Sequence, residues 1–338
     1  MIKPSKVFFS SFFLVIFLLS SLSPAQGKTF KIATLSPEGS DWMQKMRTGA
    51  KRIQQRTNGR VKFKFYPGGV MGDDQAVLRK IRIGQLHGGA LSGGSIIKAN
   101  PDYRIYGLLL SYQNQGEIDF VRRHIDPVIK KDFEKGGYVI LGMAESGFVY
   151  AMSTKQAVHN VTQLRQQKVW VPSNDRVSQE TLQSFGVTAI PLAYGDVLAG
   201  LQTGLINTVA MSPIGAIALQ WHTQIKFITD MPLLYSLGVL TIDKKAFKKI
   251  KPDDKKIVRE IMSEVFAQID SQNRKNNIEA LKVLRQLDIK FIKPSIDDKK
   301  QWQQLADRAN KKLVDSGLLN SNRVRQVDQL LSQYRQEN

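Results

Sequence analysis

Three short apolar runs alternate with two helical patterns between residues 166 and 213, and this alternation constrains the fold more than any other feature. Gly186 and Gly204 end the two helical patterns, so only short loops join the elements. The apolar runs cover residues 169–171, 187–192 and 207–211. A strand–helix–strand–helix–strand order with such short loops predicts a parallel sheet with right-handed crossovers. The sequence therefore predicts an α/β fold.

A parallel sheet of this kind also predicts where a ligand binds. Ligands of open α/β sheets lie beyond the carboxyl ends of the strands. Trp170, Tyr194 and Met211 lie at the carboxyl ends of the three predicted strands, and Trp221 lies on a helix predicted at 214–223. We expect these four side chains to line a binding site. Each is also of a type that often fills a core, which is the alternative interpretation.

The remaining patterns predict two lobes joined by several crossings. Ser40 is the expected cap of a helix that follows the first strand, and Ser173 and Asn174 are the expected caps after the run at 169–171. Further strands are expected at 29–34, 61–65, 88–92, 138–143, 147–152 and 234–241, and long helices at 252–284 and 295–331. No Gly/Ser-rich linker divides the chain, so a hinge with a ligand between the lobes is expected.

The predicted organisation divides the chain into four parts. These are a signal peptide at 1–27, a first lobe at 28–146 plus about 232–277, a second lobe at 147–231 plus about 278–320, and a helical tail at 321–338. The last part of the chain, from about residue 295, is expected to be a long C-terminal helical region.

The first residues have the features of a secretory signal peptide. A positively charged start precedes an apolar stretch at 7–22, and small residues follow. Cleavage is expected between Ala25 and Lys28, with an uncleaved anchor as the alternative. No second apolar run approaches membrane-spanning length. The mature protein is therefore expected outside the cytoplasm, without stable membrane insertion.

The charge of the chain is strongly positive. The 338 residues include 49 Lys and Arg against 29 Asp and Glu, a net charge of +20. The basic residues are spread in pairs along predicted helices, which favours a solvated surface over a nucleic-acid site. A basic protein that binds anionic envelope components is the alternative, and a pull-down on anionic lipid that weakens with salt would support it.

Catalytic and metal-binding motifs are not found in the sequence. The chain has no cysteine, and its four histidines lack metal-ligand spacing. The glycine-rich loop at 67–72 lacks the pattern of a phosphate loop, and no Gly-x-Ser-x-Gly is present. An enzyme, a cofactor and a metal are therefore not expected. Asp73 suits the first helical turn after this loop, but it remains a candidate ligand contact with Ser36, Glu38 and Ser92.

Three motifs in order resemble one family of transport proteins. They are Gly-Arg-Val at 59–61 leading to Pro-Gly-Gly-Val-Met-Gly-Asp at 67–73, Lys-Val-Trp-Val-Pro at 168–172, and Ala-Gly-Leu-Gln-Thr-Gly at 199–204. From about residue 30 to about 315 the chain resembles the dicarboxylate-receptor (DctP-like) solute receptors of tripartite ATP-independent periplasmic (TRAP) transporters. The resemblance implies a two-lobed fold of the type II periplasmic-binding-protein kind with a hinge. It also implies a periplasmic receptor that closes on a small solute and delivers it to membrane permease subunits. We expect a monomer.

The chain departs from the family at the positions that contact ligand. The strand arginine of the family falls at Trp170, a second arginine of some members falls near Val149, beside Phe148, and an asparagine falls at Met211. Tyr194 keeps the aromatic character of its position. Without the guanidinium a carboxylate loses charge-assisted hydrogen bonds of about 1.5–3 kcal/mol each. We therefore expect an apolar and aromatic pocket for an aromatic or apolar solute, or for a cation, rather than for a small dicarboxylate.

One alternative keeps the usual cargo of the family. In it the receptor binds an organic acid of the C4-dicarboxylate kind, and Ser36, Ser92 or main-chain N–H groups hold the carboxylate.

Overall fold

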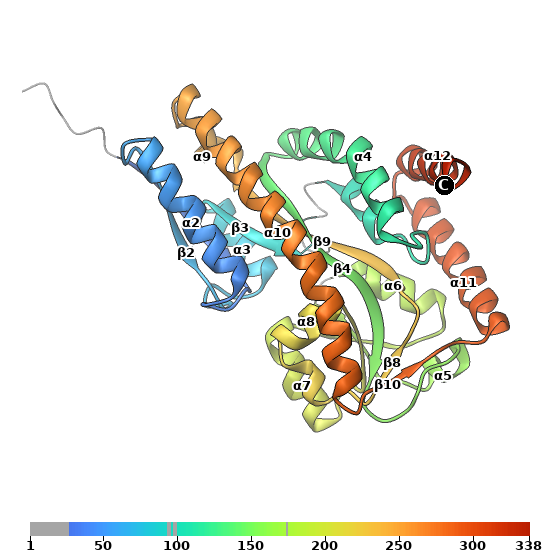
Figure 1. Ribbon diagram of the computed structural model, residues 1–338. Helices are drawn as coiled ribbons and strands as arrows, with labels where there is room; N and C mark the ends of the chain where they lie inside the picture. Colours follow the sequence, from blue (N-terminus) through green and yellow to red (C-terminus); the bar gives the residue numbers. More distant parts are fainter. Residues whose placement is uncertain (1–26, 93–95, 97–99, 174) are drawn as a thin grey trace, which may run out of the picture.

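The computed structural model describes residues 27–92, 96, 100–173 and 175–338, which form two lobes built on mixed sheets (Figure 1). The signal peptide predicted at 1–27 lies, apart from its last residue, outside the described residues. Within the described ranges, no helix combines the length and the apolar character needed to cross a membrane.

The sheet of the first lobe has the order β2-β1-β3-β9-β4. β1 (Lys28–Thr34) pairs in parallel with β2 (Val61–Tyr66) and β3 (Gly88–Ser92). β9 (Leu234–Asp243) pairs antiparallel with β3 and with β4 (Tyr138–Ser153). The predicted return of the chain to the first lobe near residue 234 is therefore confirmed.

The sheet of the second lobe contains the strand–helix alternation that the sequence predicts. β5 (Val169–Pro172) pairs in parallel with β6 (Ala189–Leu192) and β7 (Thr208–Met211), and β7 pairs antiparallel with β4. The crossovers contain α6 (Arg176–Ser184) and α7 (Val197–Thr203). This part of the prediction is confirmed.

The N-cap of α6 is a different residue from the one that the sequence predicts. Asp175, rather than Ser173, accepts a hydrogen bond from the backbone N–H of Ser178. Asn174, the other expected cap, lies outside the described residues. By contrast Ser40 caps α2 (Asp41–Arg56) as expected, because its hydroxyl accepts from the N–H of Met43.

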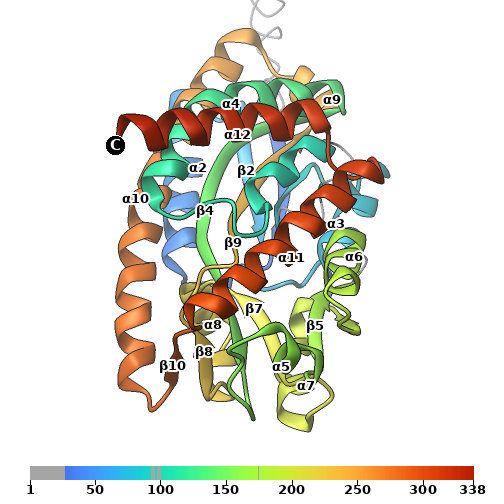
Figure 2. The same cartoon turned by 90° about the vertical axis from the view of Figure 1, so that its right-hand side faces the viewer.

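β4 is a single strand where the sequence predicts two. Its register against β9 shifts between Ile140 and Gly142 and again between Glu145 and Gly147. Such bulges bend a strand without ending it, and Gly147 takes the positive φ of +95° that glycine tolerates. The strand thus continues from the first sheet into the second (Figure 2).

α10 (Pro252–Gln286) also belongs to both lobes. Ile269 packs in the core of the first lobe, and Leu284 packs in the core of the second. In Figure 1 this helix runs along the whole molecule beside β4. A strand and a long helix therefore link the lobes.

The C-terminal region, predicted to be helical at 295–331, consists of two helices. α11 (Ile296–Asp315) places Trp302 in a core of the second lobe, whereas α12 (Ser321–Glu337) packs on α4 (Gln115–Lys135) and η1 (Pro101–Gly107). Figure 2 shows α12 lying across α4. The helix predicted at 214–223 is likewise divided, into α8 (Pro213–Ala218) and η3 (Trp221–Thr223). The other helical segments are α3 (Asp74–Arg82), α5 (Val161–Arg165), η2 (Tyr194–Asp196) and α9 (Lys244–Lys248). Two short strands complete the second-lobe sheet: β8 (Phe227–Thr229) pairs with β4 and with β10 (Lys290–Ile292).

Candidate functional site

A cavity of about 280 Å³ lies between the lobes. Its second-lobe wall is formed by β5, the end of β7, α6 and Tyr194. Its first-lobe wall is formed by η1, the start of β9 and the last residue of β3, and α11 contributes side chains as well. The cavity therefore lies at the carboxyl ends of the parallel strands, where a ligand of such a sheet is expected.

Trp170 lies at the boundary between the second-lobe core and the cavity. Its indole Nε1–H donates to the backbone carbonyl oxygen of Leu192 at 3.0 Å. Its ring meets the rings of Tyr194 and Trp221 edge to face, with centroids 5.1 Å away in both cases. Only 4% of Trp170 is exposed, yet it lines the cavity. The indole is therefore a fixed wall of the site rather than a freely mobile contact.

Tyr194 and Ser92 approach each other from opposite lobes. Both line the cavity, Tyr194 after β6 and Ser92 at the end of β3. Burial raises the pKa of the Tyr194 phenol well above its usual value, and a hydrogen bond with Ser92 opposes that rise. Tyr194 is thus a neutral hydroxyl at the cavity. Ser92 also bonds through its N–H and its hydroxyl to the Asp74 carboxylate.

Met211 and Val149 also line the cavity and pack close to the same wall. Tyr150 of β4 is the strand partner of Met211. The side chains of Met211 and Val149 present a thioether and a branched aliphatic group, neither of which can pair with a carboxylate. Both residues therefore offer apolar surface to the cavity, and their part in ligand binding stays a prediction.

The other aromatic candidates lie behind the lining. Trp221 is 1% exposed and stacks on Tyr194 with centroids 6.2 Å apart. Phe148 meets the ring of Tyr235 edge to face at 5.3 Å, and Tyr235 itself lines the cavity. Both side chains are placed to support the wall from the far side.

The polar candidates near the first two strands have local partners. Glu38 forms an ion pair with Arg47 at 2.5 Å, and this hydrogen bond lowers the pKa of its carboxyl. Ser36 donates its N–H to the hydroxyl of Thr34 at 3.1 Å. Asp73 caps α3, accepting from the N–H of Ala76 at 2.7 Å. None of these three is among the described residues that line the cavity.

Replacing Asp73 with alanine tests its structural role. We expect the free energy of unfolding to fall by about 1 kcal/mol, because the helix loses its cap. Ligand affinity is expected to stay within twofold of that of the wild type. Asp73→Asn is the matched control, since asparagine caps equally well. Chemical denaturation and calorimetric titration measure the two effects, and a large loss of affinity in Asp73→Ala would return Asp73 to the site.

Sequence reasoning missed Arg104 of η1. Its guanidinium lines the cavity, and its Nε and Nη1 atoms are buried without an acceptor among the described residues. Burial lowers the pKa of Arg104 to about 10, so the group remains charged at neutral pH. The segment 101–107 has no clear helical or strand period, and no motif contains the arginine. The sequence therefore offers no signal for it.

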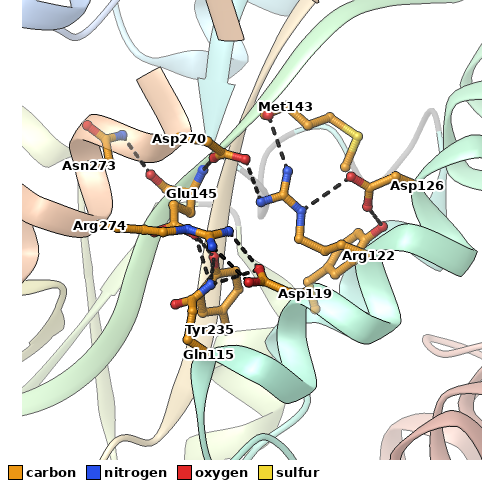
Figure 3. Close-up of polar contacts among 11 residues, drawn as sticks. Gln115, Asp119, Arg122, Asp126, Met143, Glu145, Tyr235, Asp270, Asn273 and Arg274 are labelled. Carbon is orange, nitrogen blue, oxygen red and sulfur yellow. Dashed lines mark hydrogen bonds and ion pairs between the residues drawn. The ribbon is translucent and has the colours of Figure 1, made fainter. Parts of the chain in front are cut away.

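A polar network, drawn in Figure 3, meets the first-lobe wall at Tyr235. The hydroxyl of Tyr235, a lining residue, donates to the carboxylate of Glu145 on β4. Arg274 of α10 pairs with Glu145 at 3.1 Å and with Asp119 of α4 at 2.6 Å. Gln115 donates to the same carboxylates. The network therefore ties the cavity wall to the strand and the helix that link the lobes.

A cavity enclosed between two lobes that share a crossing strand defines a solute receptor of the periplasmic-binding-protein kind. The sequence model of the DctP family, described as bacterial extracellular solute-binding protein, family 7, matches residues 32–316. This match covers most of the chain, so the chain belongs to this family of solute-binding proteins. The resemblance given by the three sequence motifs is confirmed.

Curated relatives are distant. The chain is 24% identical over 212 residues to a solute-binding protein of Verminephrobacter eiseniae, covering 61% of this chain and 62% of that protein. It is 21% identical over 203 residues to the 2,3-diketo-L-gulonate-binding periplasmic protein YiaO of Escherichia coli, covering 60% of this chain and 61% of that protein. In both cases the matched region spans less than two thirds of the relative.

Solved structures share the fold over nearly their whole length. A TRAP solute-binding protein of Ralstonia eutropha, with bound (S)-2-acetolactate, has a TM-score of 0.82 at 18% identity, covering 90% of this chain and 99% of that chain. The sugar-acid-binding protein of Advenella mimigardefordensis, in complex with galactonate, has a TM-score of 0.83 at 16% identity, covering 91% and 99%. At these identities the likeness establishes the two-lobed fold.

Proposed function

We propose that this chain is the extracytoplasmic receptor of a TRAP transporter for a small organic solute with an apolar or aromatic body. The lining of the interlobe cavity carries the proposal. Trp170, Tyr194 and Met211 present two rings and a thioether to the cavity, and leucine and valine side chains supply much of the remaining lining. A small dicarboxylate has two charges to be met, and such a wall leaves most of a charged group unpaired.

Relatives of the same fold support a cargo of this size. Acetolactate and galactonate occupy the two neighbours described above, and a TRAP receptor of Desulfovibrio salexigens holds orotic acid. All three are small organic acids, which supports an acidic group on the cargo of this chain too. The positive charge of Arg104 at the cavity argues against the alternative of a cationic cargo.

The proposed role includes the cellular setting. The signal sequence at 1–27 directs export and is cleaved, and the mature monomer works in the periplasm. It binds its solute there and passes it to TRAP permease subunits, without catalysing a reaction. The basic residues on the surface keep the protein soluble and do not bind nucleic acid or lipid.

A substitution in the apolar wall tests the proposed cargo. We expect Met211→Ala to weaken binding of an aromatic solute about tenfold to fiftyfold, because the contacts of two or three buried groups, about 0.8 kcal/mol each, are lost. Met211→Leu conserves volume and is expected to bind like the wild type. Calorimetric titration against aromatic acids, succinate and malate provides the measurement. Tight succinate or malate binding that Met211→Ala leaves undiminished would contradict the proposal.

A further inference from the structure

The guanidinium of Arg104 has unused hydrogen-bonding capacity at the cavity. Its Nε carries one N–H and its Nη1 carries two, so three of its five donors have no acceptor among the described residues. A buried charged donor left unpaired lowers stability. Such a group in a native fold calls for an explanation.

The segment that carries Arg104 is held firmly. Asn100 caps η1 by accepting from the N–H of Asp102 at 3.0 Å, and its amide donates to a carbonyl of α4. Tyr103, Ile105 and Tyr106, around Arg104 in the chain, are 3% exposed or less and pack in the first-lobe core. The arginine is therefore presented to the cavity from a rigid element, as a ligand-binding group needs to be.

The two carboxylates that attract the Arg104 guanidinium electrostatically form their hydrogen bonds with other groups. Asp175 of the second lobe caps α6 and accepts from the Ser178 hydroxyl at 2.6 Å. Glu180 pairs with Arg176 at 2.8 Å. Both attract the guanidinium electrostatically, but burial outweighs them and the pKa of Arg104 stays lowered. The positive charge facing the cavity is thus only partly balanced.

Two other polar lining groups, Asn310 and Tyr235, have partners within the chain. The side-chain amide of Asn310 accepts from the N–H of Leu109 at 3.2 Å and donates to its carbonyl at 3.0 Å. The hydroxyl of Tyr235 donates to Glu145. The hydroxyl of Tyr103, the residue before Arg104, is a second buried lining group without a partner among the described residues.

We propose that Arg104 anchors the carboxylate of the cargo, so that the receptor selects an organic monoanion whose apolar end meets the aromatic wall of the second lobe. The inference rests on the proposed function and adds the anion and the residue that selects it. The guanidinium that relatives are expected to carry at the position of Trp170 is then replaced from the opposite lobe. Because charge and apolar body contact different lobes, one ligand of this kind bridges both.

A matched pair of probes tests the anchor. Phenylacetate and phenylacetamide have the same ring and nearly the same shape, but only the first is charged. In the wild type we expect phenylacetate to bind at least tenfold more tightly by calorimetric titration. In Arg104→Gln that preference is expected to fall to twofold or less, because glutamine offers neutral hydrogen bonds only.

Different failures point to different errors. A preference for phenylacetate that persists in Arg104→Gln, or equal binding of the two probes to the wild type, would overturn the anchor and leave the apolar cargo standing. If benzoate, phenylacetate and 3-phenylpropanoate all fail to bind, the anchor is likewise wrong. If succinate binds tightly and none of the three aromatic acids binds, the proposed function is overturned instead.

Asp175→Asn separates an anchor from a latch between the lobes. Asparagine caps a helix as well as aspartate does, so α6 is expected to remain intact. If Arg104 holds the anion, removing the nearby negative charge preserves or strengthens phenylacetate binding. If Arg104 instead closes the lobes by pairing with Asp175, both probes bind less well, and the anchor is overturned.

The ligand-free protein gives an independent readout. Arg104→Met removes an unpaired buried charge and keeps the aliphatic stem. We expect the Tm of the ligand-free protein to rise by about 2–4 °C while phenylacetate binding is lost. A fall in Tm would mean that Arg104 stabilises the fold through partners of its own, which would contradict the inference.

Discussion

Replacing Arg274 with alanine is expected to lower the free energy of unfolding by about 3 kcal/mol, because it leaves a buried carboxylate without its counter-charge. Glu145 is 2% exposed on the crossing strand β4, and Arg274 pairs with it at 3.1 Å (Figure 3). The same guanidinium bonds twice to Asp119, at 2.6 and 2.8 Å. Arg274 itself is about one third exposed, which keeps the expected loss at the lower end for a buried pair.

The pH dependence of that loss identifies its cause. Burial raises the pKa of Glu145, while the Tyr235 hydrogen bond and the charge of Arg274 oppose the rise. Removing Arg274 therefore raises this pKa further. A carboxyl whose pKa is higher in the folded state than in the unfolded state stabilises the fold while it is protonated. This stabilisation is lost as the pH rises through the pKa of the folded state. The destabilisation by Arg274→Ala is thus expected to be largest above neutral pH and to shrink toward about pH 5.

Urea denaturation of three proteins at about pH 7.5 and about pH 5 provides the measurement. The double variant Glu145→Gln with Arg274→Ala is the control, because a neutral amide does not need the counter-charge. At about pH 7.5 the double variant is expected to lose less unfolding free energy than the two single variants lose when their losses are added. Equal destabilisation by Arg274→Ala at both pH values would contradict this account. The loss would then come from packing or from Asp119.

The network has a second consequence for the receptor. Glu145 lies on β4, Arg274 on α10 and Tyr235 on β9, next to the cavity. β4 and α10 are elements with side chains in both lobes. A fixed charge arrangement at this point therefore holds the linking elements in register where the cavity wall begins.

The fold of the second lobe could be predicted because its signals are local. The run at 169–171, the glycines at 186 and 204 and the helical spacing between them each act within a few residues. β4 was predicted as two strands because a bulge depends on the partner strand, here β9, which lies about 90 residues further along the chain. Pairing between distant segments leaves no local pattern.

The lining of the cavity could be predicted only where it follows from topology. Trp170, Tyr194 and Met211 line the cavity because strand ends of a parallel sheet meet at one edge. Asp73 and Glu38 lie in loops near such ends, but a cap and an ion pair engage them locally. Arg104 reaches the cavity from a 3₁₀ segment whose position depends on packing against α4 and α12. Polar residue type near a strand end is therefore a weaker guide than the hydrogen-bond partners that the folded chain provides.

Trp221→Ala is expected to lower the free energy of unfolding by about 3–5 kcal/mol and to impair ligand binding, although Trp221 lies outside the cavity lining. The indole is 1% exposed and packs against both Trp170 and Tyr194, with centroids 5.1 and 6.2 Å away. Alanine would leave a void directly behind these two lining rings. Because an aromatic wall binds only when its rings are held in place, we expect the affinity for an aromatic carboxylate to fall about tenfold.

Trp302→Ala is the matched control for this effect. Trp302 is 2% exposed in a different second-lobe core, and its indole N–H donates to the carbonyl of His159. Its loss is expected to reduce stability by a similar amount, without a change in affinity for the folded protein. Denaturation curves and calorimetric titration at a temperature where all variants are folded separate the two quantities. Wild-type affinity in Trp221→Ala would mean that the rings of Trp170 and Tyr194 do not depend on it, and that the apolar wall is held from elsewhere.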